Sequence, residues 1–256
     1  MRDLAVFLRK ELRELVRTKR LLILLGLFVV VGIMNPAVAK LTPVILEMTS
    51  ESMAEMGVTI GEVKVTSLDC WTQFVKNMPI ALIVTLIMFS GIYTTEYTKG
   101  TLVLLLTKGL SRSSAVLAKF AAMLITWSAG SWLCFGITYF YSAYYWDNSA
   151  VNELFFSAFC WWLFGAFMLC GIVFFSSFVG SGAHVMLGVG GAYVVMTLIG
   201  ISAKAKEYLP THLIDSSPLY TGVAVPSDYL ASAAVTALLS VGLVIAALPL
   251  TKKRQL

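Results

Sequence analysis

The sequence predicts an all-α integral membrane protein with six transmembrane helices. Of its 256 residues, 58% are hydrophobic and only 13% are charged, which leaves too little polar surface for a soluble domain of this length. Six segments are also apolar over the roughly 20 residues that a helix needs to cross a bilayer. We expect residues 1–256 to form a single membrane domain.

The first element is an amphipathic helix over residues 1–20. Its apolar residues recur at helical spacing and its basic residues fall on the other side, a pattern typical of a helix that lies in the membrane interface. Glu11 falls inside the apolar stripe, between Phe7 and Leu15. A carboxylate there is costly unless it is paired, so we expect a partner from another part of the chain. The candidate donors are the backbone around Gly100 and Thr101, and the side chains of Lys108 and Arg112.

The same start also resembles a secretory signal, because a basic segment and an apolar run precede Ala37-Val38-Ala39. The basic segment is long and itself patterned as a helix, and Pro36 stands directly before the small residues. Both features disfavour cleavage.

Basic residues indicate how the six spans are oriented. The predicted spans cover residues about 21–39, 77–95, 116–141, 153–178, 183–202 and 229–250. Fourteen Lys and Arg fall on the side that holds both termini and the loop after the second span, and five fall on the other side. Because basic loops stay in the cytoplasm, both termini are expected inside. The aromatic cluster 139–146 then lies at the outer interface, where Tyr and Trp prefer to sit.

Two outer loops carry further structure. In loop 40–76, Thr42 and Pro43 are a good helix start, and we predict a short amphipathic helix that ends at Gly57 and packs on the membrane surface or serves as a substrate lid. The same loop is expected to hold Cys70. Loop 203–228 contains three prolines yet is half apolar, which favours a re-entrant or surface-lying hairpin before the last span.

Several classes of protein lose support from residues that are missing. None of the 14 acidic residues falls at mid-membrane, where carriers driven by ion gradients usually place them. Backbone carbonyls could still hold sodium, so a secondary transporter stays an alternative, as does a non-transporting sensor or scaffold. Neither H-E-x-x-H, G-x-S-x-G, G-K-[ST] nor C-x-x-C occurs. We therefore expect no catalytic, cofactor or metal residue in this chain, and no nucleic-acid partner.

The stretch 96–120 is charged although it lies between two apolar spans. Its charged residues are Glu96, Lys99, Lys108, Arg112 and Lys119. An ordinary solvated loop would also carry charge. The alternative is a cytoplasmic surface that an external motor contacts.

Taken together, these features resemble the permease subunits of type 2 ATP-binding-cassette (ABC) transporters. The family's interfacial elbow helix carries a KEL-type sequence, matched here by residues 10–12. Its second-span exit and coupling segment follow E-x-x-x-G-T-x-x-x-L-L and then a Ser-Arg pair. The matching residues are Glu96, Gly100, Thr101, Leu105, Leu106, Ser111 and Arg112. Many members have Pro where this chain has Gly109, so the turn there departs from the family pattern.

The resemblance implies a function and a set of partners. The chain would be the permease subunit of an ATP-driven exporter in a bacterial or archaeal cell membrane, paired with a second or homologous permease. Separate ATPase subunits would bind ATP and Mg²⁺. Short cytoplasmic coupling helices would contact them, through Glu96, Lys99, Gly100, Thr101, Lys108, Ser111 and Arg112, with Glu11 joining the elbow helix to this surface. The apolar, aromatic spans favour a hydrophobic or amphipathic compound, lipid or peptide as cargo.

Overall fold

The fold is a bundle of long helices. The computed structural model describes residues 2–55, 64–98 and 111–253, and no β-strand occurs in these three segments. Within them six helices are long and apolar enough to cross a membrane. They are α2 (Arg20–Glu55), α3 (Ser67–Ser90), α6 (Arg112–Tyr145), α7 (Leu154–Ser176), α8 (Gly182–Ile199) and α11 (Pro226–Lys253). The predicted all-α class with six spans is therefore confirmed.

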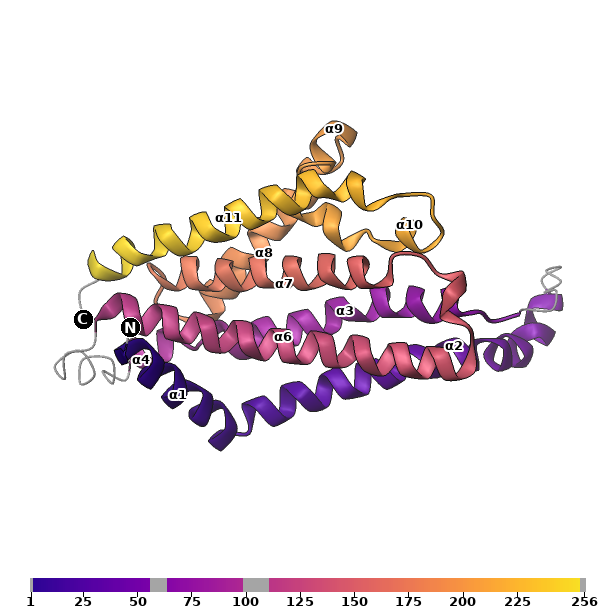
Figure 1. Cartoon of the computed structure of the whole chain (residues 1–256), viewed down its shortest axis with the longest axis horizontal. Helices are drawn as coiled ribbons and strands as arrows, with labels where there is room; N and C mark the ends of the chain where they lie inside the picture. Colours follow the sequence, from indigo (N-terminus) through magenta and orange to yellow (C-terminus); the bar gives the residue numbers. More distant parts are fainter. Residues whose placement is uncertain (1, 56–63, 99–110, 254–256) are drawn as a thin grey trace.

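The long helices lie side by side along the longest axis of the molecule (Figure 1). α7 is the most enclosed of the six, with 67% of its apolar window buried, whereas α8 and α11 bury only 11% each. Tryptophans fill the centre: Trp127 of α6 donates its indole N–H to the Trp162 carbonyl of α7 at 2.9 Å. Such satisfied polar tips allow Trp to be buried. The chain ends lie together at one end of the bundle, called here the termini end (Figure 1).

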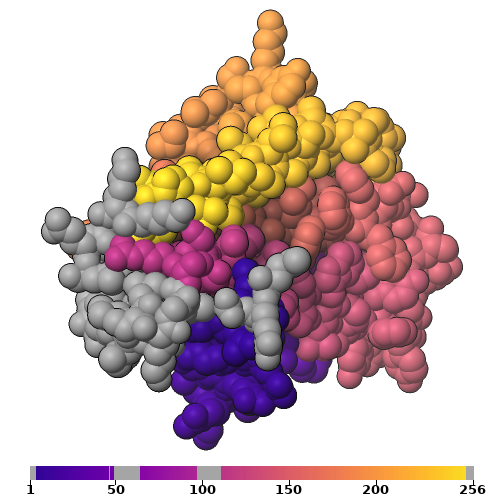
Figure 2. Space-filling view, turned by 60° about the vertical axis from the view of Figure 1, so that its left-hand side comes forward, coloured from indigo at the N-terminus to yellow at the C-terminus, as the bar shows by residue number. Residues whose placement is uncertain are grey.

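At the termini end, the N-terminal segment predicted as an amphipathic helix forms α1 (Arg2–Arg17). Lys19, with a positive φ of 59°, makes the turn from α1 into α2. The five-residue helix α4 (Thr94–Thr98) follows α3 at the same end. Figure 2, turned to bring this end forward, shows α1, the start of α6 and the end of α11 as neighbours.

The helix predicted to begin at Thr42 is not a separate element. α2 continues without a break from Arg20 to Glu55, through Pro36 and Pro43. An N-cap threonine would accept a hydrogen bond from a backbone N–H, but the Thr42 hydroxyl donates to the Val38 carbonyl at 2.8 Å. Each proline removes one helix hydrogen bond, and side-chain hydroxyls and neighbouring helices can make up for that loss in membrane proteins.

The second span was also predicted too short, since α3 begins at Ser67 rather than near residue 77. Thr66 starts it: the backbone N–H of Thr66 donates to the Asp69 carboxylate at 2.8 Å, as in a capping box. Cys70, expected in a loop, is therefore buried in α3. The prediction began too late because Asp69 and Lys76 lower the mean hydropathy of residues 67–76, although one face of this part of α3 is apolar and buried.

The proline-containing segment before the last span forms short helices. They are α9 (Ala203–Lys206), η2 (Pro210–Ile214) and α10 (Ser217–Tyr220), and another short helix, η1 (Asn148–Ala150), precedes α7. The Ser157 hydroxyl of α7 donates to the buried Tyr220 hydroxyl at 2.8 Å, which fixes α10 to the bundle. The Tyr229 hydroxyl donates to the Asp215 carbonyl at 2.7 Å. Re-entry of this segment into a membrane stays a prediction.

Candidate functional site

α1 buries the stripe that its sequence pattern indicates. Phe7, Glu11 and Leu15 stand at four-residue intervals and are only 5%, 3% and 4% exposed. Residues four apart on a helix lie one above the other, so the Glu11 carboxylate is enclosed between two apolar side chains. It therefore needs a partner inside the protein.

That partner is Lys119. Its ammonium lies 2.9 Å from a Glu11 carboxylate oxygen and 3.0 Å from an oxygen of Glu96. The Lys119 side chain is 3% exposed. It stands on the face of α6 where small residues, Ala115 and Ala122 among them, are buried, which leaves room for α1 to approach closely. One lysine thus joins α1, α6 and the segment that follows α3.

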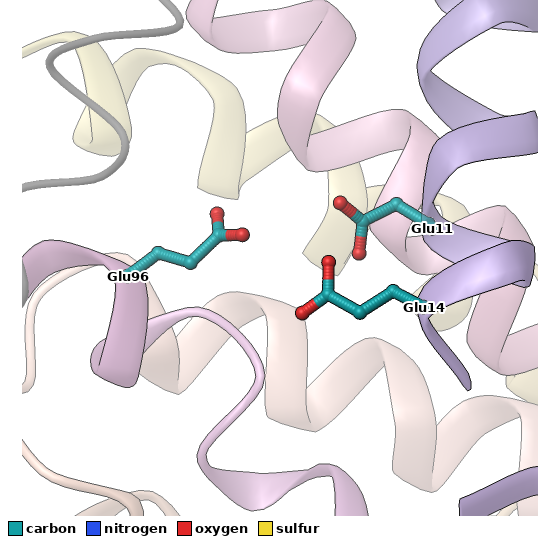
Figure 3. A group of neighbouring side chains, drawn as sticks. All are labelled: Glu11, Glu14 and Glu96. Carbon is teal, nitrogen blue, oxygen red and sulfur yellow. The ribbon is translucent and has the colours of Figure 1, made fainter. Parts of the chain in front are cut away.

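Lys10 completes the group from the solvent side. Its ammonium lies 2.9 Å from Glu11, 2.8 Å from Glu14 and 3.5 Å from Glu96, with the side chain 41% exposed. We call Lys10, Glu11, Glu14, Glu96 and Lys119 the ionic cluster. Figure 3 shows its three carboxylates pointing toward one another, Glu96 from α4 and the other two from α1.

In the exposed part of the cluster, Lys10 and Glu14 stabilise each other's ionised form. Burial alone would lower the pKa of Lys10, but hydrogen bonds to Glu14 and Glu11 and the nearby carboxylates outweigh it, so the pKa of Lys10 is raised. The hydrogen bond from Lys10 lowers the pKa of Glu14. Lys10 and Glu14 are therefore both ionised at neutral pH.

The three carboxylates are close enough to hold a metal ion, with one oxygen of each within 4.8 Å of the others. Two lysine ammonium groups already supply positive charge to them. The arrangement is that of an ionic network. One oxygen of Glu96 is buried and has no hydrogen-bond partner among the residues that the structure describes. It can accept a hydrogen bond from a donor that approaches α4.

The predicted coupling residues have different places in the structure. Glu11 and Glu96 are brought together, whereas Lys99, Gly100, Thr101 and Lys108 lie outside the described residues. The Ser111 hydroxyl caps α6 and accepts from the Ser114 N–H at 3.0 Å. The Arg112 guanidinium donates to the Thr251 carbonyl of α11 at 3.2 Å. Arg112 therefore ties the beginning of α6 to the end of the last long helix.

Lys10 and Lys119 were missed as members of the site. Lys119 could have been found, because it follows Ala115 by four residues and precedes Ala122 by three, on one helical face. A lysine on a face of small residues signals close helix packing and a buried partner. The basic partner expected for Glu11 exists, but the structure places it in the third span rather than in the coupling segment.

Six helices are long and apolar enough to cross a membrane, which indicates a multi-pass membrane protein. A family model described as ABC-2 family transporter protein matches residues 5–214. This is more than half of the chain, which therefore belongs to the ABC-2 transporter family. Members are membrane permease components of ABC transporters. None of the curated proteins compared with the chain matches it.

Proposed function

We propose that this chain forms the translocation pathway of an ATP-driven transporter and receives movement from a separate ATPase through the segment after α3. The observation that carries the proposal is the position of Lys119, buried between Glu11 of α1 and Glu96 of α4. Glu96 stands directly before residues 99–110, where the family resemblance places the ATPase contact. A displacement of that segment would act on Glu96 first.

Buried ion pairs make such a connection stiff. Separating one partner from a buried pair leaves an uncompensated charge and costs about 3–5 kcal/mol. α1, α4 and α6 would therefore move together rather than slide past one another. The Tyr93 hydroxyl, which donates to the Val116 carbonyl at 3.0 Å, adds a second tie between the end of α3 and α6. The Arg112–Thr251 hydrogen bond extends the connection to α11.

The remaining parts of the proposal concern the partners. ATP and Mg²⁺ would be bound by the ATPase, whose subunits pair with this chain and a second permease on the cytoplasmic side. We infer that the termini end faces the cytoplasm, because the basic residues gather there. The cargo would be a hydrophobic or amphipathic compound that enters between apolar helices and is exported.

Spin labels test the coupling without knowledge of the cargo. The complex is purified through a tag on this chain, and labels are placed on exposed Val16 of α1 and exposed Tyr208 beyond α9. Trapping the ATPase with ATP and vanadate should change the distance between the labels. Glu11→Gln and Glu96→Gln should assemble normally but lose most of this change, because an amide holds Lys119 only by a neutral hydrogen bond.

Glu14→Gln is the matched control, since Glu14 belongs to the same cluster but is 49% exposed. It should leave the distance change intact, because exposed ion pairs contribute little. Equal distance changes in all three variants would show that the cluster transmits nothing. Solute movement down an ion gradient by the purified chain alone would contradict the ATP-driven function itself.

A further inference from the structure

An apolar groove runs between α3 and α8. It has a volume of about 370 Å³, within the range of small-molecule sites. The groove is lined by residues of α3 from Pro79 to Leu86 and by Val189 and Tyr193 of α8. Trp161 of α7 forms part of its wall. The groove is open along its length and suits an acyl chain or another slender apolar group.

One cation of α3, Lys76, precedes the residues that line this groove. Lys76 is the only Lys or Arg of the candidate span Ser67–Glu96. At 100° per residue it lies on the same face as Ile83, which lines the groove. It precedes Pro79 by three residues, slightly less than one helical turn. It therefore lies on the side of Pro79 that points to the end of the bundle opposite the termini.

The Lys76 side chain is exposed and has no ion-pair or hydrogen-bond partner within residues 2–55, 64–98 and 111–253. Two other lysines of the long helices are accommodated by the protein. Lys119 is paired with two carboxylates, and the Lys40 ammonium lies 3.9 Å from the centre of the Tyr145 ring. Lys76 is therefore left to meet an anion that the chain does not supply.

Lys76 also lies within a candidate membrane span, Ser67–Glu96. The Trp71 ring packs 5.3 Å from Phe135 and 6.4 Å from Tyr139, where the aromatic cluster 139–146 begins. Lys76 is five residues further along α3, about 7.5 Å further from this cluster along the helix at the rise of an α-helix. Ionisable residues at membrane depth are costly and mark functional positions.

We propose that the groove binds a single-chain amphiphile with an anionic headgroup, such as a carboxylate, sulfate or phosphate. The apolar chain lies between α3 and α8 and points toward the termini end, and the headgroup accepts hydrogen bonds from the Lys76 ammonium. The charge of Lys76 is what favours this ligand over neutral bilayer lipid. Its role as cargo rests on the proposed permease function, whereas its binding does not.

Photolabelling in a neutral membrane tests the binding. The purified chain, without ATPase or ATP, is placed in phosphatidylcholine nanodiscs and labelled with a diazirine analogue of palmitic acid. The label should appear in α3 and α8 and be displaced by palmitate at least tenfold more effectively than by hexadecanol, which has the same chain length without the charge. Equal displacement by both competitors would reduce the groove to a lipid-filled surface and overturn the proposal.

Variants separate the two halves of the site. Lys76→Gln should weaken palmitate binding about tenfold, while Lys76→Arg should retain it, and Lys204→Gln, at an exposed lysine of α9, should change nothing. Gly190 lines the groove and an added Cβ there meets no atom within 4 Å, so the ring of Gly190→Phe can enter the groove and should abolish labelling. Unchanged palmitate binding in Lys76→Gln would show that Lys76 does not bind the headgroup of the ligand, and would overturn the proposal.

Failure of this proposal can be told from failure of the proposed function. A chain that binds palmitate through Lys76 but shows no ATP-dependent distance change keeps this site and contradicts ATP-driven coupling. A chain that shows the distance change but binds palmitate and hexadecanol alike keeps the coupling and overturns the anion site.

Discussion

At the scale of single residues, Glu11 shows how far sequence alone can go. Its place between Phe7 and Leu15 predicts burial, and burial of a carboxylate predicts a partner, either a basic side chain or backbone N–H groups; the structure shows a buried Glu11 paired with a basic side chain. The identity of the partner could not be predicted, because Lys119 lies 108 residues away and its contact depends on how α6 is rotated against α1. Helical periodicity gives the face of each helix but not which faces meet.

Lys119→Met is expected to destabilise the fold strongly. The variant leaves the buried Glu11 and the largely enclosed Glu96 with only the more exposed Lys10 as a cation, so the free energy of unfolding should fall by about 3–5 kcal/mol. The measurement is chemical unfolding of the purified chain in detergent. Lys204→Met, at an exposed position, should stay within about 0.5 kcal/mol of the parent.

The double variant Glu11→Gln/Lys119→Met checks the cause of that loss. It removes one of the two carboxylate charges that Lys119 neutralises together with the lysine, and it should recover part of the stability because neutral replacements of buried ion pairs are often tolerated. If the double variant is less stable than Lys119→Met, the carboxylates do not repel each other and the account of the cluster is wrong.

At the scale of elements, the positions of the spans were easier to predict than their ends. A window average of hydropathy finds the most apolar part of a helix, whereas α2 and α3 continue as helices beyond the predicted apolar segments. Pro43 also suggested a helix start, since proline is common in a first turn. Inside α2 the Thr42 hydroxyl binds the Val38 carbonyl, which no window average detects.

Close packing between α6 and α7 depends on glycine. A Cβ added at Gly165 would overlap the indole of Trp127, which is completely buried and holds the Trp162 carbonyl. Gly165→Ala should therefore lower the free energy of unfolding by about 1–3 kcal/mol, as overpacking does. At Gly136 of α6 an added Cβ meets nothing within 4 Å. Gly136→Ala should be neutral or stabilising by up to about 1 kcal/mol. The two melting temperatures, compared in the same detergent, decide this point.

The segment before α11 should respond to acid through His212. Its ring stacks on Tyr229 with centroids 4.5 Å apart, and its Nδ1 atom is buried with no hydrogen-bond partner among the described residues. Burial lowers the pKa of His212 below 6.5 and Lys206 lowers it further, against smaller opposite effects of Asp215, Glu207 and Asp228. The unfolded chain then binds the proton more readily, so stability falls as the pH drops below 6.5.

The variant His212→Phe keeps the stacking and removes the titration. Between pH 7.5 and 5.5 the parent should lose more of its melting temperature than this variant, because only the parent takes up a proton on unfolding. Identical losses in both proteins would mean that His212 is as easily protonated in the folded segment as in the unfolded chain.

At the scale of the whole molecule, apolar side chains cover much of the surface as well as filling the core. α7 is enclosed by its neighbours, whereas α8 and α11 expose long apolar faces. Exposed residues of this kind include Leu187, Leu198, Leu238 and Ile245. In water such faces would be a liability, but lipid or a partner helix can cover them, and backbone hydrogen bonds within each helix leave few polar groups to satisfy. Charge is instead concentrated at the ends.

The distribution of basic residues predicts which end is inside. Fourteen Lys and Arg belong to the side of the termini and five to the other, so residues 1–20, 100–112 and 251–256 should face the cytoplasm and residues 50–60 and 205–225 the exterior. The four native cysteines are free and buried, so the parent protein should react little with a thiol reagent. In intact cells an impermeant maleimide should label Tyr208→Cys, at a side chain that is 57% exposed. Arg17→Cys, at an exposed position in the last turn of α1, should react only after the cells are permeabilised. Labelling of Arg17→Cys in intact cells would reverse the orientation, and would place the ionic cluster on the side of the membrane where no ATP-driven motor could reach it.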